Sequence, residues 1–358
     1  ILHWPLALFR YGSRKVIAAT PGDNRLQATP TATGQSSMSN IPPGSAIGVD
    51  LGGTKIHAAV VGPDGTVIAE HRLPTDVGGG PTKIVEDIVR AVRDELNADL
   101  SVIDAVGVGL AGQIDAETGV VRSSPNLKWK DFPFGESLQQ ALGIPVVVEN
   151  DVTTAAWGEW RYGTGPEVDD LLVLYVGTGV GGGIVSDGNL LAGDCGMAGE
   201  VGHMTIVAGG RQCSCPNRGC LEAYVGGWAI AERAIEAVVA DPEAGRGLLD
   251  MARGEELTAR LVGEAAEAGD ELALELMYDT GQYLGAGLTG LIHIFNPARV
   301  ILGGGVIEGS PGLVLAAESV VQASAIPAYT NGLEIRRSEL AGNAGVSGSA
   351  SMALQRVV

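Results

Sequence analysis

Residues 46–55, Ala-Ile-Gly-Val-Asp-Leu-Gly-Gly-Thr-Lys, place a glycine turn directly after a short apolar strand. Apolar strands follow at residues 56–61 and, beyond a Pro-Asp-Gly turn, at residues 66–71. The same order of strand, glycine turn, strand and Asp-Gly turn recurs in residues 171–188, about 120 residues further along the chain. A repeat on this scale predicts two related lobes rather than a solenoid, whose period is roughly 20–50 residues. Two lobes enclose a cleft, and clefts hold ligands.

Helices and buried strands are expected through the rest of the chain. Apolar residues at helical spacing predict a helix over residues 81–97 and a long helix over residues 270–295. Short apolar runs predict buried strands at residues 102–108, 146–149 and 299–302. The last of these strands runs into a further glycine turn, Gly303-Gly-Gly305.

The composition excludes several classes of protein. Hydrophobic residues make up 45% of the 358-residue chain and charged residues 18%, so we expect a packed core and no global disorder. The formal net charge of −19 opposes non-specific binding to DNA and to anionic membranes. No run of eighteen apolar residues occurs, so we expect no membrane span. The 54 glycines favour tight turns and close approach of the backbone to ligands.

Residues 1–45 differ from the remainder of the chain. They carry four basic side chains against Asp23 alone, and they are rich in Thr, Ser, Pro and Gly from Ala18 onward. This composition predicts a mostly disordered arm. Transit peptides share the basic, acid-poor character, but we favour an upstream extension with Met38 near the natural start.

Two glycine motifs fit the dinucleotide-binding pattern, Gly107-x-Gly109-x-x-Gly112 and Gly177-x-Gly179-x-x-Gly182. Each is followed by residues typical of a strand or turn instead of the required helix, so we reject this function. The first turn ends Gly-Gly-Thr-Lys, which is the wrong order for a Walker A loop. Two Gly/Thr turns remain, and they either cradle phosphate oxygens with successive N–H groups or are ordinary hairpins. The candidate phosphate-binding residues are Asp50, which could orient hydrated Mg²⁺, and Gly52, Gly53, Thr54, Lys55, Gly177, Thr178 and Gly179.

The tripeptide Glu149-Asn150-Asp151 stands where an apolar strand ends and a helix begins. Asp151 can cap that helix, and the residues alone leave open that it does nothing else. The carboxyl end of a strand is also where α/β proteins place ligand groups. Transfer of a phosphoryl group to a hydroxyl needs a base in such a place, so Asp151 is also a candidate catalytic residue.

A histidine and three cysteines follow with the spacing His203-x9-Cys213-x-Cys215-x4-Cys220. Three thiolates and one imidazole complete a tetrahedral zinc shell that leaves no position for water, which predicts a structural zinc in a reducing compartment. Three free buried cysteines are the alternative. Cys195 lies outside this spacing and is expected to be a small buried residue.

Together these motifs resemble the ROK family of bacterial sugar kinases and repressors from about Ala46 to the C-terminus. The resemblance rests on the order and spacing of the motifs rather than on any one of them. Pro216 is a departure, since the family's cysteine motif has glycine there, but the metal-ligand positions are intact. Further matching residues are Ser124-Pro-Asn126-Leu, Glu200-x-x-His203, Glu222, Asn296-Pro297, Gly303 to Gly305 and a glycine-rich C-terminal helix near Gly345.

The resemblance implies an α/β protein with the actin-like ATPase (ribonuclease H-like) fold, in which two lobes flank a central cleft. The first lobe would span residues 46–150 and be completed by a helix at about 342–358, and the larger lobe would span residues 151–341 with the zinc loop at 203–220. Asp151 would be the catalytic base, and Gly303 and Gly304 would join the ATP-binding residues. One ring nitrogen of His203 would bind zinc and the other the sugar. The implied sugar-binding residues are Asn126, Asn150, Asp151, Glu200, His203 and Glu222.

The implied reaction is ATP-dependent phosphorylation of a hexose at its 6-hydroxyl, with Mg²⁺ and a structural Zn²⁺. Glucose is the first choice of sugar, and N-acetylglucosamine, N-acetylmannosamine and fructose are alternatives; polyphosphate is an alternative phosphoryl donor. We expect a cytoplasmic homodimer that binds sugar and ATP but neither nucleic acid nor membrane. The rival within the family is a sugar-responsive repressor, although the residues before Ala46 lack the periodicity of a helix-turn-helix.

Overall fold

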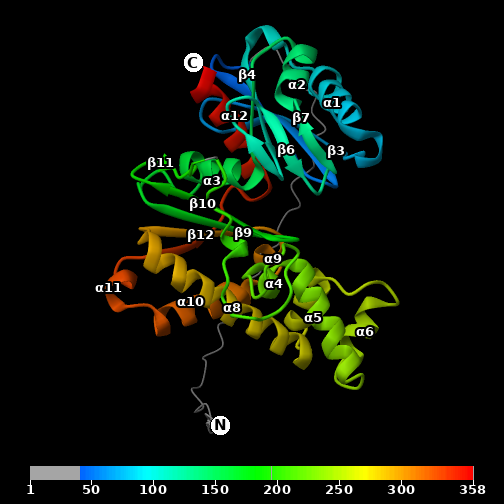
Figure 1. Cartoon of the computed structure of the whole chain (residues 1–358), viewed down its shortest axis with the longest axis vertical. Coiled ribbons are helices and arrows are strands. Elements are labelled where there is room, and N and C mark those ends of the chain that lie inside the picture. The colour runs from blue at the N-terminus through cyan, green and yellow to red at the C-terminus, as the bar shows by residue number, and fades with distance from the viewer. Residues whose placement is uncertain (1–40, 195, 358) are drawn as a thin grey trace, which may run out of the picture. The chain divides into compact units, whose positions relative to one another are not determined.

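The computed structural model of the chain describes residues 41–194 and 196–357. Its first sheet has five strands in the order β3-β2-β1-β4-β8 (Figure 1). Strand β1 is antiparallel to β2 and parallel to β4, and β4 is parallel to β8. The strands are β1 (Ser45–Leu51), β2 (Lys55–Val61), β3 (Val67–Pro74), β4 (Ile103–Leu110) and β8 (Val146–Asn150).

A second five-stranded sheet repeats this topology in the order β11-β10-β9-β12-β13. Strand β9 is antiparallel to β10 and parallel to β12, and β12 is parallel to β13. Two sheets with one shared topology account for the internal repeat seen in the sequence. The strands are β9 (Leu171–Val176), β10 (Val180–Ser186), β11 (Asn189–Leu190), β12 (Arg299–Gly303) and β13 (Glu334–Arg337).

Each sheet buries its own hydrophobic core against helices. The largest core cluster joins the second sheet to the long helix α8 and its neighbours, and another joins the first sheet to α1 and α2. Figure 1 shows α8 and α10 side by side along the second sheet. The helices are α1 (Gly80–Arg90), α2 (Phe134–Leu142), α3 (Asp151–Tyr162), α4 (Glu222–Val225), α5 (Gly227–Ala240), α6 (Arg246–Ala252), α7 (Ala259–Glu267), α8 (Glu271–Phe295), α9 (Gly305–Glu308), α10 (Pro311–Ser324), α11 (Pro327–Thr330) and α12 (Ala344–Val357).

The C-terminal helix α12 packs directly on β1, β4 and α3. Glycines make this approach possible, since a Cβ on Gly48 would lie 1.9 Å from the Val346 carbonyl oxygen and a Cβ on Gly107 1.8 Å from that of Ser349. A Cβ on Gly348 would lie 1.7 Å from the carbonyl oxygen of Thr154, in α3. Helix α3 also contacts β10 of the second sheet, so α3 lies between the two sheets.

Two local predictions need correction. The helix predicted over residues 81–97 is α1 followed by a wider π-helical turn, Ala91–Glu95. The predicted glycine turn at residues 177–183 is shorter, because Gly181, Gly182 and Gly183 are paired with β9 inside strand β10. Side chains there would collide with α3, since a Cβ on Gly183 would lie 2.3 Å from the Ala156 Cβ.

Other predicted elements are observed with small changes at their ends. The predicted long helix is α8, which Asp270 caps through the Ala273 N–H. No helix among residues 41–194 and 196–357 has both the length and the apolar composition to cross a bilayer. A small third sheet precedes α2 and consists of β5 (Gln113–Asp115), β6 (Val120–Ser124) and β7 (Trp129–Phe132). The predicted arm lies outside the described residues as far as residue 40, and so does Cys195.

Candidate active site

The first glycine turn connects β1 to β2 and is closed by a hydrogen bond of 2.9 Å from the Gly52 N–H to the Lys55 carbonyl. Asn126, from the exposed loop between β6 and β7, packs against this turn, because a Cβ on Gly53 would lie 3.3 Å from the Asn126 Cβ. The structure therefore brings one predicted sugar-binding residue next to one predicted phosphate-binding turn.

Asp50 stands at the end of β1, just before this turn. The start of α12 lies beside it, since a Cβ on Gly345 would be 3.1 Å from the Asp50 Cγ. Burial raises the pKa of Asp50, although the positive charges of Lys55, His57 and Arg72 oppose the shift. A glycine at position 345 thus leaves room for a carboxylate at the junction of strand, turn and helix.

The second glycine turn connects β9 to β10, with the Gly177 N–H donating to the Gly179 carbonyl over 3.0 Å. Gly303 is the last residue of β12, the strand next to β9, and Gly304 follows it. Gly304 has φ 93°, and a Cβ there would lie 2.5 Å from the Val176 carbonyl oxygen, so a side chain is excluded for two reasons. The two glycine segments of the second sheet are therefore neighbours at one edge.

Asp151 is the first residue of α3, and its side chain does not cap this helix. Asn150 is the N-cap instead, because its Oδ1 accepts from the N–H groups of Val152 (2.9 Å) and Thr153 (3.1 Å). Asp151 Oδ1 accepts from the Val152 N–H alone over 3.0 Å. A Cβ on Gly109 of β4 would lie 3.3 Å from the Asp151 Cα, so the aspartate sits close above the first sheet.

The surroundings of Asp151 raise the pKa of its carboxyl group to about 6. Burial is the main cause, and the negative charges of Asp50 and Glu200 add to it, while the Val152 N–H opposes it. A carboxylate with a pKa near neutrality accepts a proton more readily than an ordinary aspartate does, and it is still mostly ionised at pH 7. Asp151 is thus suited to act as a general base.

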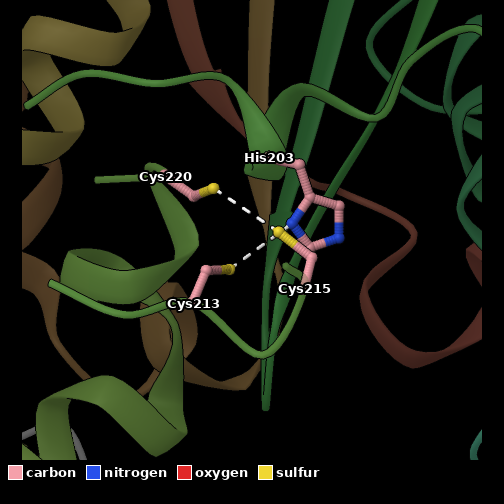
Figure 2. A group of neighbouring side chains, drawn as sticks. All are labelled: His203, Cys213, Cys215 and Cys220. Carbon is pink, nitrogen blue, oxygen red and sulfur yellow. Dashed lines mark hydrogen bonds between the residues drawn. The ribbon is translucent and has the colours of Figure 1, made fainter. Parts of the chain in front are cut away.

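His203, Cys213, Cys215 and Cys220 come together in one cluster (Figure 2). Their four candidate ligand atoms all lie within 4.8 Å of one another. The Sγ atoms of Cys215 and Cys220 are 3.7 Å apart, and the His203 Nδ1 is 3.6 Å from the Cys213 Sγ. Zinc–sulfur bonds of about 2.3 Å place two sulfurs of a tetrahedron about 3.8 Å apart, so the four residues fit a zinc ion.

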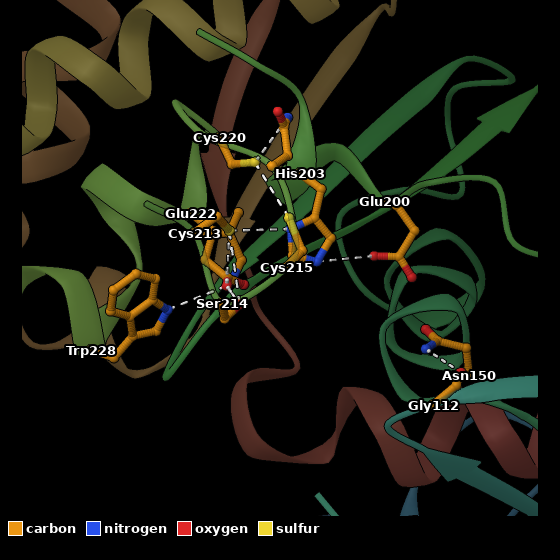
Figure 3. Close-up of polar contacts among 12 residues, drawn as sticks. Gly112, Asn150, Glu200, His203, Cys213, Ser214, Cys215, Cys220, Glu222 and Trp228 are labelled. Atoms are coloured by element: carbon orange, nitrogen blue, oxygen red, sulfur yellow. Dashed lines mark hydrogen bonds and ion pairs between the residues drawn. The ribbon is translucent and has the colours of Figure 1, made fainter. Parts of the chain in front are cut away.

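The imidazole of His203 connects this cluster to Glu200. While Nδ1 points at the thiols, Nε2 is 4.0 Å from the Glu200 Oε2 (Figure 3). The side chains of His203 and Glu200 are 36% and 60% exposed, so both can reach a ligand. The two ring nitrogens thus face different partners, as expected for an imidazole that serves a metal and a substrate at once.

Glu222 is buried, and protein groups donate to both of its oxygens. Oε1 accepts from the Ser214 Oγ (2.7 Å) and the Trp228 Nε1 (3.2 Å), and Oε2 accepts from the Val180 N–H (3.0 Å). Oε1 also accepts weakly from the Cys213 Sγ over 3.9 Å. Each carboxylate oxygen has about two acceptor positions, so capacity for a further donor remains on Oε2, which has one protein donor.

A cavity of about 50 Å³ runs between Asn150 and Glu200. Both five-stranded sheets contribute to its walls, through Asn150 at the end of β8 and through Gly181 and Gly182 of β10. A larger cavity of about 710 Å³ lies elsewhere, beside β8 and Arg356. The chemistry of the lining residues, and not the volume of the cavity, therefore identifies the site.

Three residues that hold the site together were not predicted from the sequence. Ser214 and Trp228 donate to Glu222, and Arg356 donates to the buried Glu149 over 2.8 Å. Ser214 lies between two metal-ligand candidates, which is a signal that could have been used. Trp228 is six residues from Glu222 but belongs to no recognisable motif, and Arg356 is 207 residues from its partner Glu149.

Comparisons with known proteins agree with this geometry. A family model described as the ROK family matches residues 46–356. A glucokinase of Halalkalibacterium halodurans is 36% identical over 314 residues, covering 87% of this chain and 95% of that protein. A crystal structure of a ROK family glucokinase from Streptomyces griseus, in complex with glucose and AMPPNP, superposes with a TM-score of 0.77 at 35% identity, covering 87% of this chain and 99% of that chain. A xylose repressor of Caldicellulosiruptor bescii is 33% identical, covering 87% of this chain and 78% of that protein.

The structural match confirms the predicted α/β fold of the actin-like ATPases, with its two related sheets. The family match begins at Ala46, where the resemblance was expected to begin, and continues into α12. On these grounds the chain belongs to the ROK family.

Proposed function

We propose that this protein is an ATP-dependent glucokinase, which converts glucose to glucose 6-phosphate. The observation that carries the proposal is Asp151, a partly buried carboxylate with a pKa of about 6, whose chain neighbours Asn150 and Val152 line the cavity that reaches Glu200. The similarity to glucokinases, at 36% identity for the Halalkalibacterium halodurans protein, supports glucose as the substrate. The AMPPNP in the related Streptomyces griseus structure supports ATP as the donor.

In the proposed reaction Asp151 accepts the proton of the sugar's 6-hydroxyl. The oxygen attacks the γ-phosphorus of ATP as the bond to the β-phosphate oxygen breaks, and ADP leaves. The N–H groups of Gly53 and Thr54 in the first turn, and of Thr178 and Gly179 in the second, hold the phosphate oxygens as charge develops on them. Those of Gly52 and Gly177 donate within the turns and keep their shape. Gly303 and Gly304, next to the second turn, belong to the same nucleotide site.

The sugar hydroxyls are bound by residues from both sheets and their connections, of which Asn150 and Glu200 line the cavity. Asn126 and Asn150 come from the first sheet and its loops, and Glu200, His203 and Glu222 from the second. Glu200 and the Nε2 of His203 are exposed enough to take hydroxyls, whereas Glu222 contributes the acceptor position that its protein donors leave.

Two ions belong to the proposal. Asp50 would orient Mg²⁺, which neutralises charge on the phosphates of ATP. His203, Cys213, Cys215 and Cys220 would hold a structural Zn²⁺, which keeps the loop of the sugar-binding His203 in place. Asp151 moves the proton, and the other residues of the site bind and orient the sugar and ATP.

The resemblance to the family also leads us to propose an oligomeric state and a cellular location for the protein. We expect a homodimer that works in the cytoplasm, where ATP and reduced thiols are available. N-acetylhexosamine and fructose kinases remain alternative identities, since the shape of the loops around the sugar's 2-position decides among them.

A coupled assay of ADP release tests the function, with Mg·ATP and a panel of glucose, fructose, mannose and N-acetylhexosamines. We expect turnover with glucose and a loss of about 10²–10⁴-fold in Asp151→Asn, with sugar binding retained. No ADP release with any sugar would overturn the kinase function. Turnover with a different sugar would leave the kinase but change its substrate, and near-normal turnover of Asp151→Asn would remove Asp151 as the base.

A further inference from the structure

Trp228 contacts both the sugar-binding and the nucleotide-binding elements. Its indole Nε1 donates to the Glu222 Oε1 over 3.2 Å, and its backbone N–H donates to the Thr178 carbonyl over 3.2 Å. Figure 3 shows the indole pointing at the group formed by Glu222 and Ser214. A single residue thus holds a carboxylate of the sugar site and the middle of the second glycine turn.

The second glycine turn is tied to Glu222 by further contacts. The N–H of Val180, directly after the turn, donates to the Glu222 Oε2 over 3.0 Å, and the Gly227 N–H donates to the Gly177 carbonyl over 2.9 Å. Gly179 permits this approach, because a Cβ there would lie 2.5 Å from the Glu222 Oε2. Glu222 and the turn therefore form one hydrogen-bonded unit.

The same carboxylate is joined to the metal-binding loop. Ser214, between Cys213 and Cys215, donates its hydroxyl to the Glu222 Oε1 over 2.7 Å. Glu222 is buried, so its hydrogen bonds are strong and an unmade one is costly. A displacement of the turn at Gly177–Gly179 would reach Glu222 through these hydrogen bonds, and coupling between two sites is carried by such contiguous contacts.

We infer that Trp228 is a positioning residue that couples sugar binding to ATP binding, by holding Glu222 and the Gly177–Gly179 turn in one arrangement. This inference rests on the proposed function, because it takes Glu222 as a sugar ligand and the turn as a phosphate ligand. Coupling of this kind is reciprocal, so glucose must tighten nucleotide binding by the factor by which nucleotide tightens glucose binding.

The test compares glucose binding by calorimetry without and with saturating AMPPNP, in the wild type and in Trp228→Phe. Phenylalanine keeps a ring but removes the Nε1 donor. We expect AMPPNP to lower the glucose Kd of the wild type by at least about fivefold, and to change that of Trp228→Phe by less than about twofold. Trp160→Phe is the matched control, because it loses an equivalent bond, from Nε1 to the Val168 carbonyl (2.9 Å), at the far end of α3.

The inference is overturned if Trp228→Phe keeps the wild-type ratio of glucose Kd values, if Trp160→Phe loses that ratio, or if the wild type binds glucose with no response to AMPPNP. A wild type that binds no glucose would instead overturn the proposed function. If Trp228→Phe does not fold, amide hydrogen exchange in the wild type decides the question. Saturating glucose should slow exchange at residues 177–180, and unchanged exchange there would count against the inference.

Discussion

Arg356, near the end of α12, donates a hydrogen bond of 2.8 Å to the Oε2 of Glu149, the last residue but one of β8. The other oxygen of Glu149 accepts the Asn150 N–H over 3.0 Å. The side chain of Glu149 is 8% exposed, so the ion pair is half buried and lies directly before the Asn150-Asp151 pair. Helix α12 thus holds the end of β8, which directly precedes the proposed base Asp151.

Arg356→Met should destabilise the protein by about 1–3 kcal/mol, because it leaves the buried carboxylate of Glu149 without its cation. Because the Arg356 side chain is partly exposed, the loss in free energy of unfolding should be smaller than for a fully buried ion pair. Urea unfolding measures the change in free energy of unfolding. The double variant Glu149→Gln with Arg356→Met should recover most of the loss, and a double variant as unstable as the single one would show that packing and not charge is responsible.

The pH dependence of the reaction should report Asp151. Because burial raises the pKa of this group to about 6, the base is protonated below that pH, and kcat/KM for glucose should fall as the pH is lowered through about 6. A pH profile of initial rates with subsaturating glucose measures this. An acid limb near pH 4, typical of an exposed aspartate, would contradict the assigned environment.

Asp151→Asn should also make the folded protein more stable at pH 7. The raised pKa means that folded protein binds this proton more tightly than the unfolded chain, so the free energy of unfolding falls as the pH rises from about 4 to about 6. Removing the charge should restore about 1–3 kcal/mol at pH 7. Urea unfolding at pH 5 and pH 7 checks this, with Asp250→Asn on the surface of α6 as the control that should change nothing.

Zinc removal should loosen sugar binding before the fold is lost. Elemental analysis of the purified protein should find about one zinc per chain, and Cys215→Ser should lower that content and weaken glucose binding. Circular dichroism should remain close to that of the wild type, because Cys215 is only partly buried, whereas the buried Cys213 and Cys220, which belong to the core of the second sheet, are kept. A wild-type protein free of zinc would contradict the metal site.

Two helix glycines should respond in opposite ways to alanine. Gly348→Ala in α12 should destabilise by about 1–3 kcal/mol or prevent folding, because its Cβ would lie 1.7 Å from the Thr154 carbonyl oxygen. A Cβ added at Gly290 in α8 would meet no neighbouring atom within 4 Å. Gly290→Ala should therefore raise the free energy of unfolding by about 0.5–1 kcal/mol, because alanine lowers the backbone entropy of the unfolded chain. Denaturant midpoints measured side by side would show whether the close contact of α12 with α3 is required.

Much of the fold followed from short-range patterns. The strand, turn and strand repeat at residues 46–61 and 171–186 predicted two related sheets, because apolar alternation and glycine turns act locally. The spacing from His203 to Cys220 predicted a metal-binding cluster for the same reason, since its residues lie close in sequence.

The tertiary structure alone decided what each side chain of the site contacts. It assigned the cap of α3 to Asn150 and not to Asp151, and it placed Gly181–Gly183 inside β10, with α3 packed against Gly181 and Gly183. The raised pKa of Asp151, to which Asp50 and Glu200 contribute, and the contact of Glu222 with Val180 come from segments far apart in the chain. Burial and charge depend on distances between such segments, which only packing sets, so the sequence by itself determined the parts of the site and the folded chain determined their protonation and partners.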